Sequence, residues 1–223
     1  MPTDTVNAST LIRACPEIAT VGALVFGVGH SGTSTVACML ARHGGRTFHG
    51  NRAELCEHRH LVRENQAYMA RALGGAALWR SYFTSEAISL FLNATTAKQR
   101  APERSLRKAA MNLVPKLRKP YVIKDPRLLY SLHVWATLPP PRPALVHVHR
   151  PLDALLKTYA YRHIRHNNAS HIKTRLLWEA QQLARWPFCK VSVDIRNVPT
   201  AAAKRKNACR DCYRPARLRN ASR

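Results

Sequence analysis

The chain has 223 residues, 46% of them hydrophobic, and 36 basic against 12 acidic residues give it a formal net charge of +24. This length and apolar content are typical of one globular domain. The charge predicts an anionic partner or substrate: nucleic acid, an acidic membrane surface, an acidic glycan or a nucleotide. No apolar run is long enough to span a bilayer, so we expect no transmembrane segment.

Residues 1–20 have no regular pattern, and we expect an irregular N-terminal segment. The N-terminus does not resemble a signal peptide, because Asp4 precedes any apolar stretch, and this favours a cytoplasmic location. Asn-x-Ser/Thr sequons favour a secretory or Golgi lumen instead, and they occur at Asn7, Asn93, Asn168 and Asn220. The compartment therefore stays open.

The first predicted strand, Ala23–Phe26, runs into a glycine-rich loop and a helix over residues 33–43. Gly27 to Ser34 fits the phosphate-binding pattern G-x-x-x-x-G-K-S/T, except that Thr33 replaces the lysine. Backbone N–H groups of such a loop and the helix N-terminus bind anions. Without the lysine, ordinary ATP or GTP hydrolysis is disfavoured, and another phosphate-bearing ligand is expected.

Further elements follow in an alternating order. The pattern predicts helices over residues 53–73, 85–92 and 98–119, the last with a basic face, then a strand over 121–124 and a helix over 128–136. It continues with a strand over 144–148, a helix beginning at Pro151, a helix over 170–186 and a strand over 191–193. The basic stretch 199–223 has little pattern, and we expect a disordered tail.

This alternation predicts an α/β protein with a three-layer P-loop-like fold, whose central parallel sheet is flanked by helices, over residues 21–198. In such sheets ligands bind at the carboxyl ends of the strands. Three motifs occupy three such ends: Gly27–Ser34, Lys124–Arg127 and His149–Thr158. We expect folding to bring them together.

Each of the last two motifs offers a cation. Lys124 ends a buried strand and could neutralise charge on a leaving phosphate oxygen, whereas Asp125 and Pro126 are typical of a helix start. Arg127 is either a phosphate partner or a surface residue. Arg150, at the next strand end, suits bidentate phosphate contact.

The set G-V-G-H-S-G-T-S, K-D-P-R and R-P-L-D, followed by Thr158, resembles the sulfotransferases that use 3′-phosphoadenosine 5′-phosphosulfate (PAPS), closest to their bacterial and carbohydrate-type branch. The likeness runs from about Ala23 to Asp194. It includes Glu57 to Asn65, which resembles a family segment with an acidic residue followed by an asparagine.

The resemblance implies that Arg150 and Thr158 bind the 3′-phosphate and that Lys124 assists the departing phosphate. His30 stands where many members have Arg or Lys, and it would stay protonated only beside the charge of the cofactor. The residues implied for the 5′-phosphosulfate are Gly29, His30, Ser31, Gly32, Thr33, Ser34 and Thr35. No metal is expected.

Two assignments keep alternatives. Glu57 is the first choice for the base that takes the acceptor's proton, and Glu54, His49 and His58 compete with it. The family usually has one residue between the arginine and the proline, whereas Arg150 directly precedes Pro151 here. Alignment on Pro151 would therefore give the 3′-phosphate to His149 and Lys157 instead of Arg150 and Thr158.

The implied activity is sulfuryl transfer from PAPS to an acceptor hydroxyl, and the basic segment 98–119 suits an acidic glycan as acceptor. Three other classes remain: a P-loop nucleotide kinase or phosphotransferase, a basic nucleic-acid-binding protein, and a catalytically inactive scaffold. The chain ends soon after its last strand, so a truncated or weakly active enzyme is also considered.

The six cysteines predict structural or incidental roles. Cys38 is expected to be a small core residue in the helix after the loop. Cys209 and Cys212 form a lone C-x-x-C without a second pair of ligands, which disfavours zinc.

Overall fold

The computed structural model describes residues 6–29, 31–43, 59–72, 88–89, 91, 96–117, 119–161 and 169–198. A four-stranded sheet, all parallel, forms its centre, with strand order β2-β1-β3-β4. The strands are β1 (Gly22–Phe26), β2 (Tyr121–Lys124), β3 (Ala144–His149) and β4 (Lys190–Asp194). The expected α/β fold with a parallel central sheet is confirmed.

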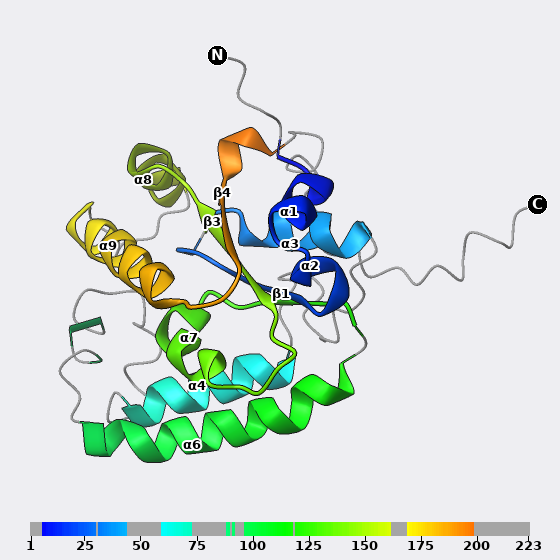
Figure 1. Ribbon diagram of the computed structural model, residues 1–223. Coiled ribbons are helices and arrows are strands. Elements are labelled where there is room, and N and C mark those ends of the chain that lie inside the picture. Colours follow the sequence, from blue (N-terminus) through cyan, green and yellow to red (C-terminus); the bar gives the residue numbers. More distant parts are fainter. Residues whose placement is uncertain are drawn as a thin grey trace, which may run out of the picture.

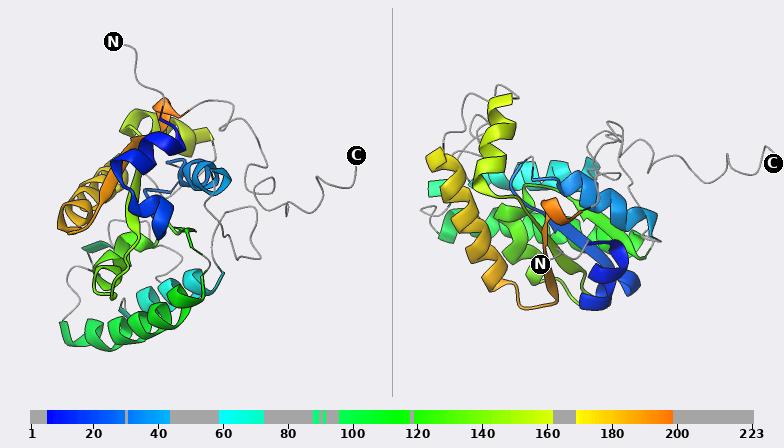
Figure 2. Two further views of the ribbon diagram at one scale, coloured as in Figure 1. Left: turned by 45° about the vertical axis from the view of Figure 1, so that its right-hand side comes forward. Right: turned by 90° about the horizontal axis from the view of Figure 1, so that it is seen from above.

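Helices cover both faces of this sheet (Figures 1 and 2). They are α1 (Ala8–Ala14), α2 (Glu17–Thr20), α3 (Thr33–Arg42), α4 (Arg59–Ala72), α6 (Thr96–Leu113), α7 (Leu128–Ala136), α8 (Leu152–Tyr161) and α9 (Ala169–Arg185). Two 3₁₀ turns, η2 (Val114–Lys116) and η3 (Ile195–Asn197), complete the described elements. Among these residues, no helix combines the length and apolar character needed to cross a bilayer.

The strands explain the three layers, because successive side chains point to opposite faces of the sheet. Leu24 and Phe26 of β1 pack in one apolar cluster with side chains of α4, α6, α7 and α9. Ala23 and Val25 of the same strand pack in a second cluster with α1, α2 and α3. Strands β1, β2 and β3 are buried on both faces along nearly their whole length and therefore appear in the sequence as mainly apolar runs, whereas the edge strand β4 is largely exposed or half-buried.

Residues 1–20 were expected to be irregular, and this is wrong for the part that the structure describes. Asn7 is the N-cap of helix α1, and its side-chain oxygen accepts a hydrogen bond of 2.9 Å from the backbone N–H of Thr10. Leu11 of α1 and Ile18 of α2 are buried in the cluster on the α3 face of the sheet. Tertiary burial stabilises two helices too short to be predicted from periodicity.

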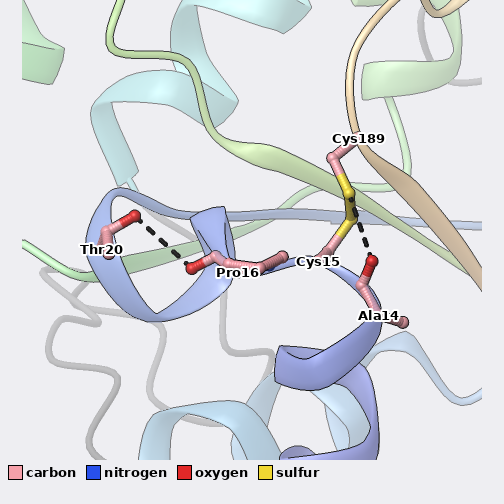
Figure 3. The surroundings of a disulfide bond; sticks show 5 residues. All are labelled: Ala14, Cys15, Pro16, Thr20 and Cys189. Atoms are coloured by element: carbon pink, nitrogen blue, oxygen red, sulfur yellow. Dashed lines mark hydrogen bonds between the residues drawn. A yellow bond between two sulfur atoms is a disulfide. The ribbon is translucent and has the colours of Figure 1, made fainter.

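A disulfide joins Cys15, after α1, to Cys189, just before β4 (Figure 3). The two Cα atoms are 5.8 Å apart, and 174 positions separate the residues in the chain. Cys38 of α3 is buried, as expected, and it is disulfide-bonded as well. No cysteine in the described part of the chain carries a free thiol.

The predicted elements agree well where they can be compared. The strand over 121–124 and the helix over 128–136 have the expected bounds, and each of the other strands is one residue longer than predicted at one or both ends. The basic segment 98–119 is helical as far as Leu113. The predicted helix over 53–73 is described only as α4, and most of 85–92 and all of 199–223 lie outside the described residues.

Candidate functional site

The glycine-rich loop connects the central strand β1 to α3. The backbone N–H of Ser31 donates to the carbonyl of Val28 at 2.9 Å, which turns the chain toward the helix. Gly32 is the N-cap of α3 with φ 98° and ψ 14°, a left-handed conformation that favours glycine, and no side chain caps the helix. The first N–H groups of α3 therefore lack a side-chain acceptor at the cap, as in an anion-binding helix start.

Ser31 lies buried inside this loop. Its side chain is 1% exposed, and its hydroxyl Oγ has no hydrogen-bond partner. A Cβ on Gly27 would come within 2.7 Å of that Oγ, so a glycine at 27 leaves the hydroxyl its space. A buried hydroxyl without a partner is costly, and a ligand oxygen would remove this cost.

Lys124 is the last residue of β2 and pairs with Val25 of β1. It is 4% exposed, which is rare for lysine. It lies two positions after Val122, which packs with the residues of α3, so both side chains face the α3 side of the sheet. The buried ammonium group thus belongs to the strand beside the glycine-rich loop.

Asp125 does more than begin a helix. One carboxylate oxygen accepts the backbone N–H of Arg127 at 2.9 Å and its Nε at 2.5 Å, and the other accepts Nδ2 of Asn65 at 2.9 Å. Asn65 in turn accepts the hydroxyl of Ser131 at 2.9 Å. Arg127 is 4% exposed and paired with Asp125, so the surface-residue alternative for Arg127 is wrong.

The third motif reaches the loop through Tyr159 of α8. The Tyr159 hydroxyl donates to the carbonyl of Gly29 at 2.5 Å. Burial raises the pKa of Tyr159, and the positive charges of Arg175 and Arg150 lower it. Arg150 is therefore near enough to act electrostatically on this phenol. Arg150 is half-buried.

Thr158, the other residue expected at the 3′-phosphate, is half-buried on α8. Its hydroxyl donates to the carbonyl of Ala154 at 2.9 Å, so here it offers lone pairs rather than a proton. The alternative pair behaves differently: His149 is half-buried and Lys157 is exposed. Burial and the neighbouring His147 lower the pKa of His149, which favours its neutral form.

Several expected residues lie outside the described part of the chain. These are His30 of the loop and all four candidates for the base, Glu57, Glu54, His49 and His58. Thr33, Ser34 and Thr35 form the first turn of α3, with Thr33 buried and the other two half-buried.

The topology brings the three motifs to one edge of the sheet. β1 lies between β2 and β3, and all three strands run in the same direction. Their carboxyl ends therefore lie side by side, with Lys124 at the end of β2, the glycine-rich loop after β1 and Arg150 after β3. Two residues at this edge were missed as contributors. Asn65 entered only as the end of a family-like segment, and Tyr159 only as one residue of a helical apolar pattern.

One group of possible metal ligands occurs among the described residues: Cys15, Glu17 and Cys189. Its two sulfurs are bonded to each other, so they are not available as thiolates. This group lies at the disulfide and not at the motif-bearing edge.

Comparison with known proteins adds no assignment. No protein-family model matches the chain, and neither a curated protein nor a solved structure matches it.

Proposed function

We propose that this protein is a sulfotransferase that moves a sulfuryl group from PAPS to an acceptor hydroxyl. The observation that carries the proposal is the shared edge of β2, β1 and β3, where a buried lysine, a glycine-rich helix start and an arginine follow adjacent strands. Parallel α/β sheets bind phosphate-bearing ligands at this edge. Ordinary P-loop NTPases need the lysine that Thr33 replaces, so a different donor is favoured.

The residues present fit such a donor on two counts. The buried Ser31 hydroxyl lacks a partner, and the cap of α3 has no side-chain acceptor, so both can receive phosphosulfate oxygens. Arg150 would hold the 3′-phosphate, with Thr158 beside it after rotation of its hydroxyl. The remaining loop positions, Gly29, His30, Gly32, Thr33, Ser34 and Thr35, would surround the 5′-phosphosulfate.

PAPS supplies the sulfuryl group and leaves as adenosine 3′,5′-bisphosphate. Lys124 would stabilise the negative charge that develops on the departing phosphate oxygen, and its burial strengthens that interaction by excluding water. His30 would add a second positive group. Tyr159 holds the Gly29 carbonyl and so keeps this oxygen turned away from an anion. Glu57 is proposed as the base, with Glu54, His49 and His58 as alternatives.

The exposed face of α6 favours an acidic acceptor. Over residues 100–113 of this helix, where burial is described, the exposed basic residues are Arg100, Arg104, Arg107 and Lys108. The spacing of positions 100, 104 and 108 gives one stripe along the helix. A stripe of cations would attract an acidic polymer, and we propose an acidic glycan.

Calorimetry tests the cofactor assignment. We expect adenosine 3′,5′-bisphosphate to bind at least tenfold more tightly than AMP or ATP, because only the bisphosphate offers a 3′-phosphate to Arg150. Arg150→Ala should remove about 10- to 100-fold of that affinity, the value of one to two charge-assisted hydrogen bonds. Lys173→Ala is the matched control, because it removes a charge of the same sign from an exposed position on α9.

Two results would contradict the assignment. Equal affinity for the three nucleotides would remove the case for PAPS, and a preference for ATP would favour a kinase. If Lys173→Ala weakens binding as much as Arg150→Ala, the effect is nonspecific electrostatics. If Lys157→Ala weakens binding more than Arg150→Ala does, the alignment on Pro151 is the better one.

The compartment is proposed from the cysteines. Disulfides persist in oxidising compartments, and Cys15, Cys38 and Cys189 are all disulfide-bonded. We therefore propose a secretory lumen over the cytoplasm. Fluorescence localisation of the tagged full-length chain tests this, and a cytoplasmic signal together with free thiols at Cys15 and Cys189 would contradict it.

A further inference from the structure

A second polar cluster lies between α9 and the strands β3 and β4, on the side of β3 away from β1, and it reaches the strand ends at His149 and Asp194. It lines a cavity of about 400 Å³, whose lining residues are His147, His149, Leu176, Glu179, Ala180, Leu183, Ser192 and Asp194. β4 is an edge strand of the sheet, and Figure 1 shows α9 on the side of the sheet where β4 lies. Three of these residues form a hydrogen-bonded row. His147 Nδ1 is 3.3 Å from the Ser192 hydroxyl, and His147 Nε2 is 3.3 Å from Glu179 Oε2.

We propose that Ser192, His147 and Glu179 form a nucleophilic array that hydrolyses small neutral carboxylic esters in this cavity. This activity is independent of sulfuryl transfer. The order hydroxyl, imidazole, carboxylate is the arrangement that activates a serine in hydrolases of unrelated folds, where it is recognised by geometry and roles rather than by fold.

The sheet positions the first two residues. His147 and Ser192 are direct partners in the parallel pairing of β3 and β4, so their side chains leave the sheet on the same face. Glu179 approaches this face from α9. Ser192 is exposed to the cavity, whereas His147 is 7% and Glu179 1% exposed. The hydroxyl thus stands at the accessible end of the row and the carboxylate at its buried end.

The buried end fixes the tautomer of the imidazole. Ionised Glu179 accepts the Nε2–H of His147, which leaves the Nδ1 lone pair facing the hydroxyl of Ser192. The two ring nitrogens exchange the roles they have in serine proteases, and the chemistry requires only that one donates to the acid and the other accepts from serine. Glu179 Oε1 has no hydrogen-bond partner, so Glu179 is held by this contact and by nearby charge.

The reaction balances with water as co-reactant. Ser192 Oγ attacks the ester carbonyl carbon while its proton passes to His147 Nδ1. The C–O bond to the alcohol then breaks, and the alcohol leaves with that proton. Water attacks the acyl-serine, its proton passes to Nδ1, and the serine oxygen takes the proton back as the carboxylic acid departs.

The lining sets the substrate class. Leu176, Ala180 and Leu183 of α9 provide apolar surface for a short acyl chain. Among the described residues that line the cavity, the acidic ones are Glu179 and Asp194 and none is a lysine or arginine, and Asp194 is paired with Arg196 beside the cavity. An anionic ester would be repelled, so a neutral one is expected. p-Nitrophenyl butyrate is a suitable probe.

Active-site labelling tests the proposal. The full-length protein should react with a fluorophosphonate, and peptide mass spectrometry should locate the adduct on Ser192. Ser192→Ala should abolish both this adduct and butyrate hydrolysis. Ser170→Ala, an exposed serine on α9, is the matched control and should change neither. Folded wild-type protein that leaves Ser192 unlabelled, or Ser192→Ala with full hydrolysis, would overturn the proposal.

Variants of the other two residues separate chemistry from folding. His147→Gln should slow hydrolysis by about 100-fold or more, the usual contribution of a general base. Glu179→Gln should cost a similar factor, because its amide donates to Nε2 and reverses the tautomer, whereas Glu179→Asp should restore part of the rate. If Glu179→Asp and Glu179→Gln lose the same activity at equal stability, the carboxylate has no part in orienting the base.

The pH profile gives a further readout. Burial raises the pKa of Glu179, while His147 and Arg175 pull it down. Because the ionised carboxylate is the working form, wild-type hydrolysis should increase with pH, and Glu179→Gln should change the profile without abolishing the increase, since the general base must itself be unprotonated. The charged or titratable groups that face the array are His149 of β3, Asp194 of β4, Arg196 of η3, Arg175 of α9 and Tyr159 of α8. A wild-type rate that does not change with pH would contradict the array.

Discussion

The Cys15–Cys189 disulfide should dominate the stability of this chain. It joins α1 to the start of β4 across 174 positions, so it closes almost the whole described fold into one loop (Figure 3). In the chain-entropy model a loop of this length removes about 17 cal/mol/K from the unfolded state, or about 5 kcal/mol at 25 °C. Measured losses on removing native disulfides are roughly 2–5 kcal/mol, so we expect 3–5 kcal/mol here.

Alanine is the suitable replacement, because Cys15 is fully buried in the apolar cluster on the α3 face and a serine would bury a hydroxyl there. Urea unfolding followed by circular dichroism measures the effect. With a slope of roughly 2 kcal/mol per molar for a domain of this size, the midpoint of Cys15→Ala/Cys189→Ala should fall by about 2 M.

The single variants provide the control. If the covalent bond carries the stability, then Cys15→Ala, Cys189→Ala and the double variant lose about the same free energy of unfolding. Losses that add between the two single variants would show that the cysteines act through separate packing. A double variant that unfolds within about 0.5 M of wild type would refute the loop-closure argument.

Three further outcomes are expected. Lys124→Met, which keeps the buried apolar stem, should lower sulfuryl-transfer turnover about 100-fold while changing calorimetric affinity for adenosine 3′,5′-bisphosphate by less than about threefold, and unchanged turnover would make Lys124 structural. Gly32→Ala should destabilise the protein by about 2 kcal/mol or more in urea unfolding, because φ is 98° and a Cβ would lie 2.5 Å from two carbons of Ile195; a loss below about 0.5 kcal/mol would contradict this. Burial raises the pKa of Glu179 in the folded protein, so the folded state keeps this proton to higher pH than the unfolded chain does. The contribution of Glu179 to the free energy of unfolding should therefore fall as the pH rises above 4.5, the usual pKa of a glutamate, and His147 and Arg175 limit this fall. Unfolding of wild type and Glu179→Gln at several pH values measures this, and wild type gaining stability relative to the variant over that range would show the reverse sign.

The sequence by itself determined the local elements and the positions of the motifs. A buried parallel strand is a short apolar run and a helix is an apolar pattern with its own spacing, so both can be identified without knowledge of their partners. The strand over 121–124 and the helix over 128–136 were predicted for this reason. The same strand and helix predictions place the three motifs at strand ends, because in a β-α order each loop follows the carboxyl end of its strand.

Only the tertiary structure decided which distant residues meet. Strand order, the pairing of Cys15 with Cys189, the Tyr159 bond to Gly29 and the row from Ser192 to Glu179 all join segments far apart in the chain. Nothing local in the sequence encodes such pairings, since the packing of helices on the sheet selects them. Helices α1 and α2 show the same limit, because their apolar residues become helical by burial against α3 and the sheet.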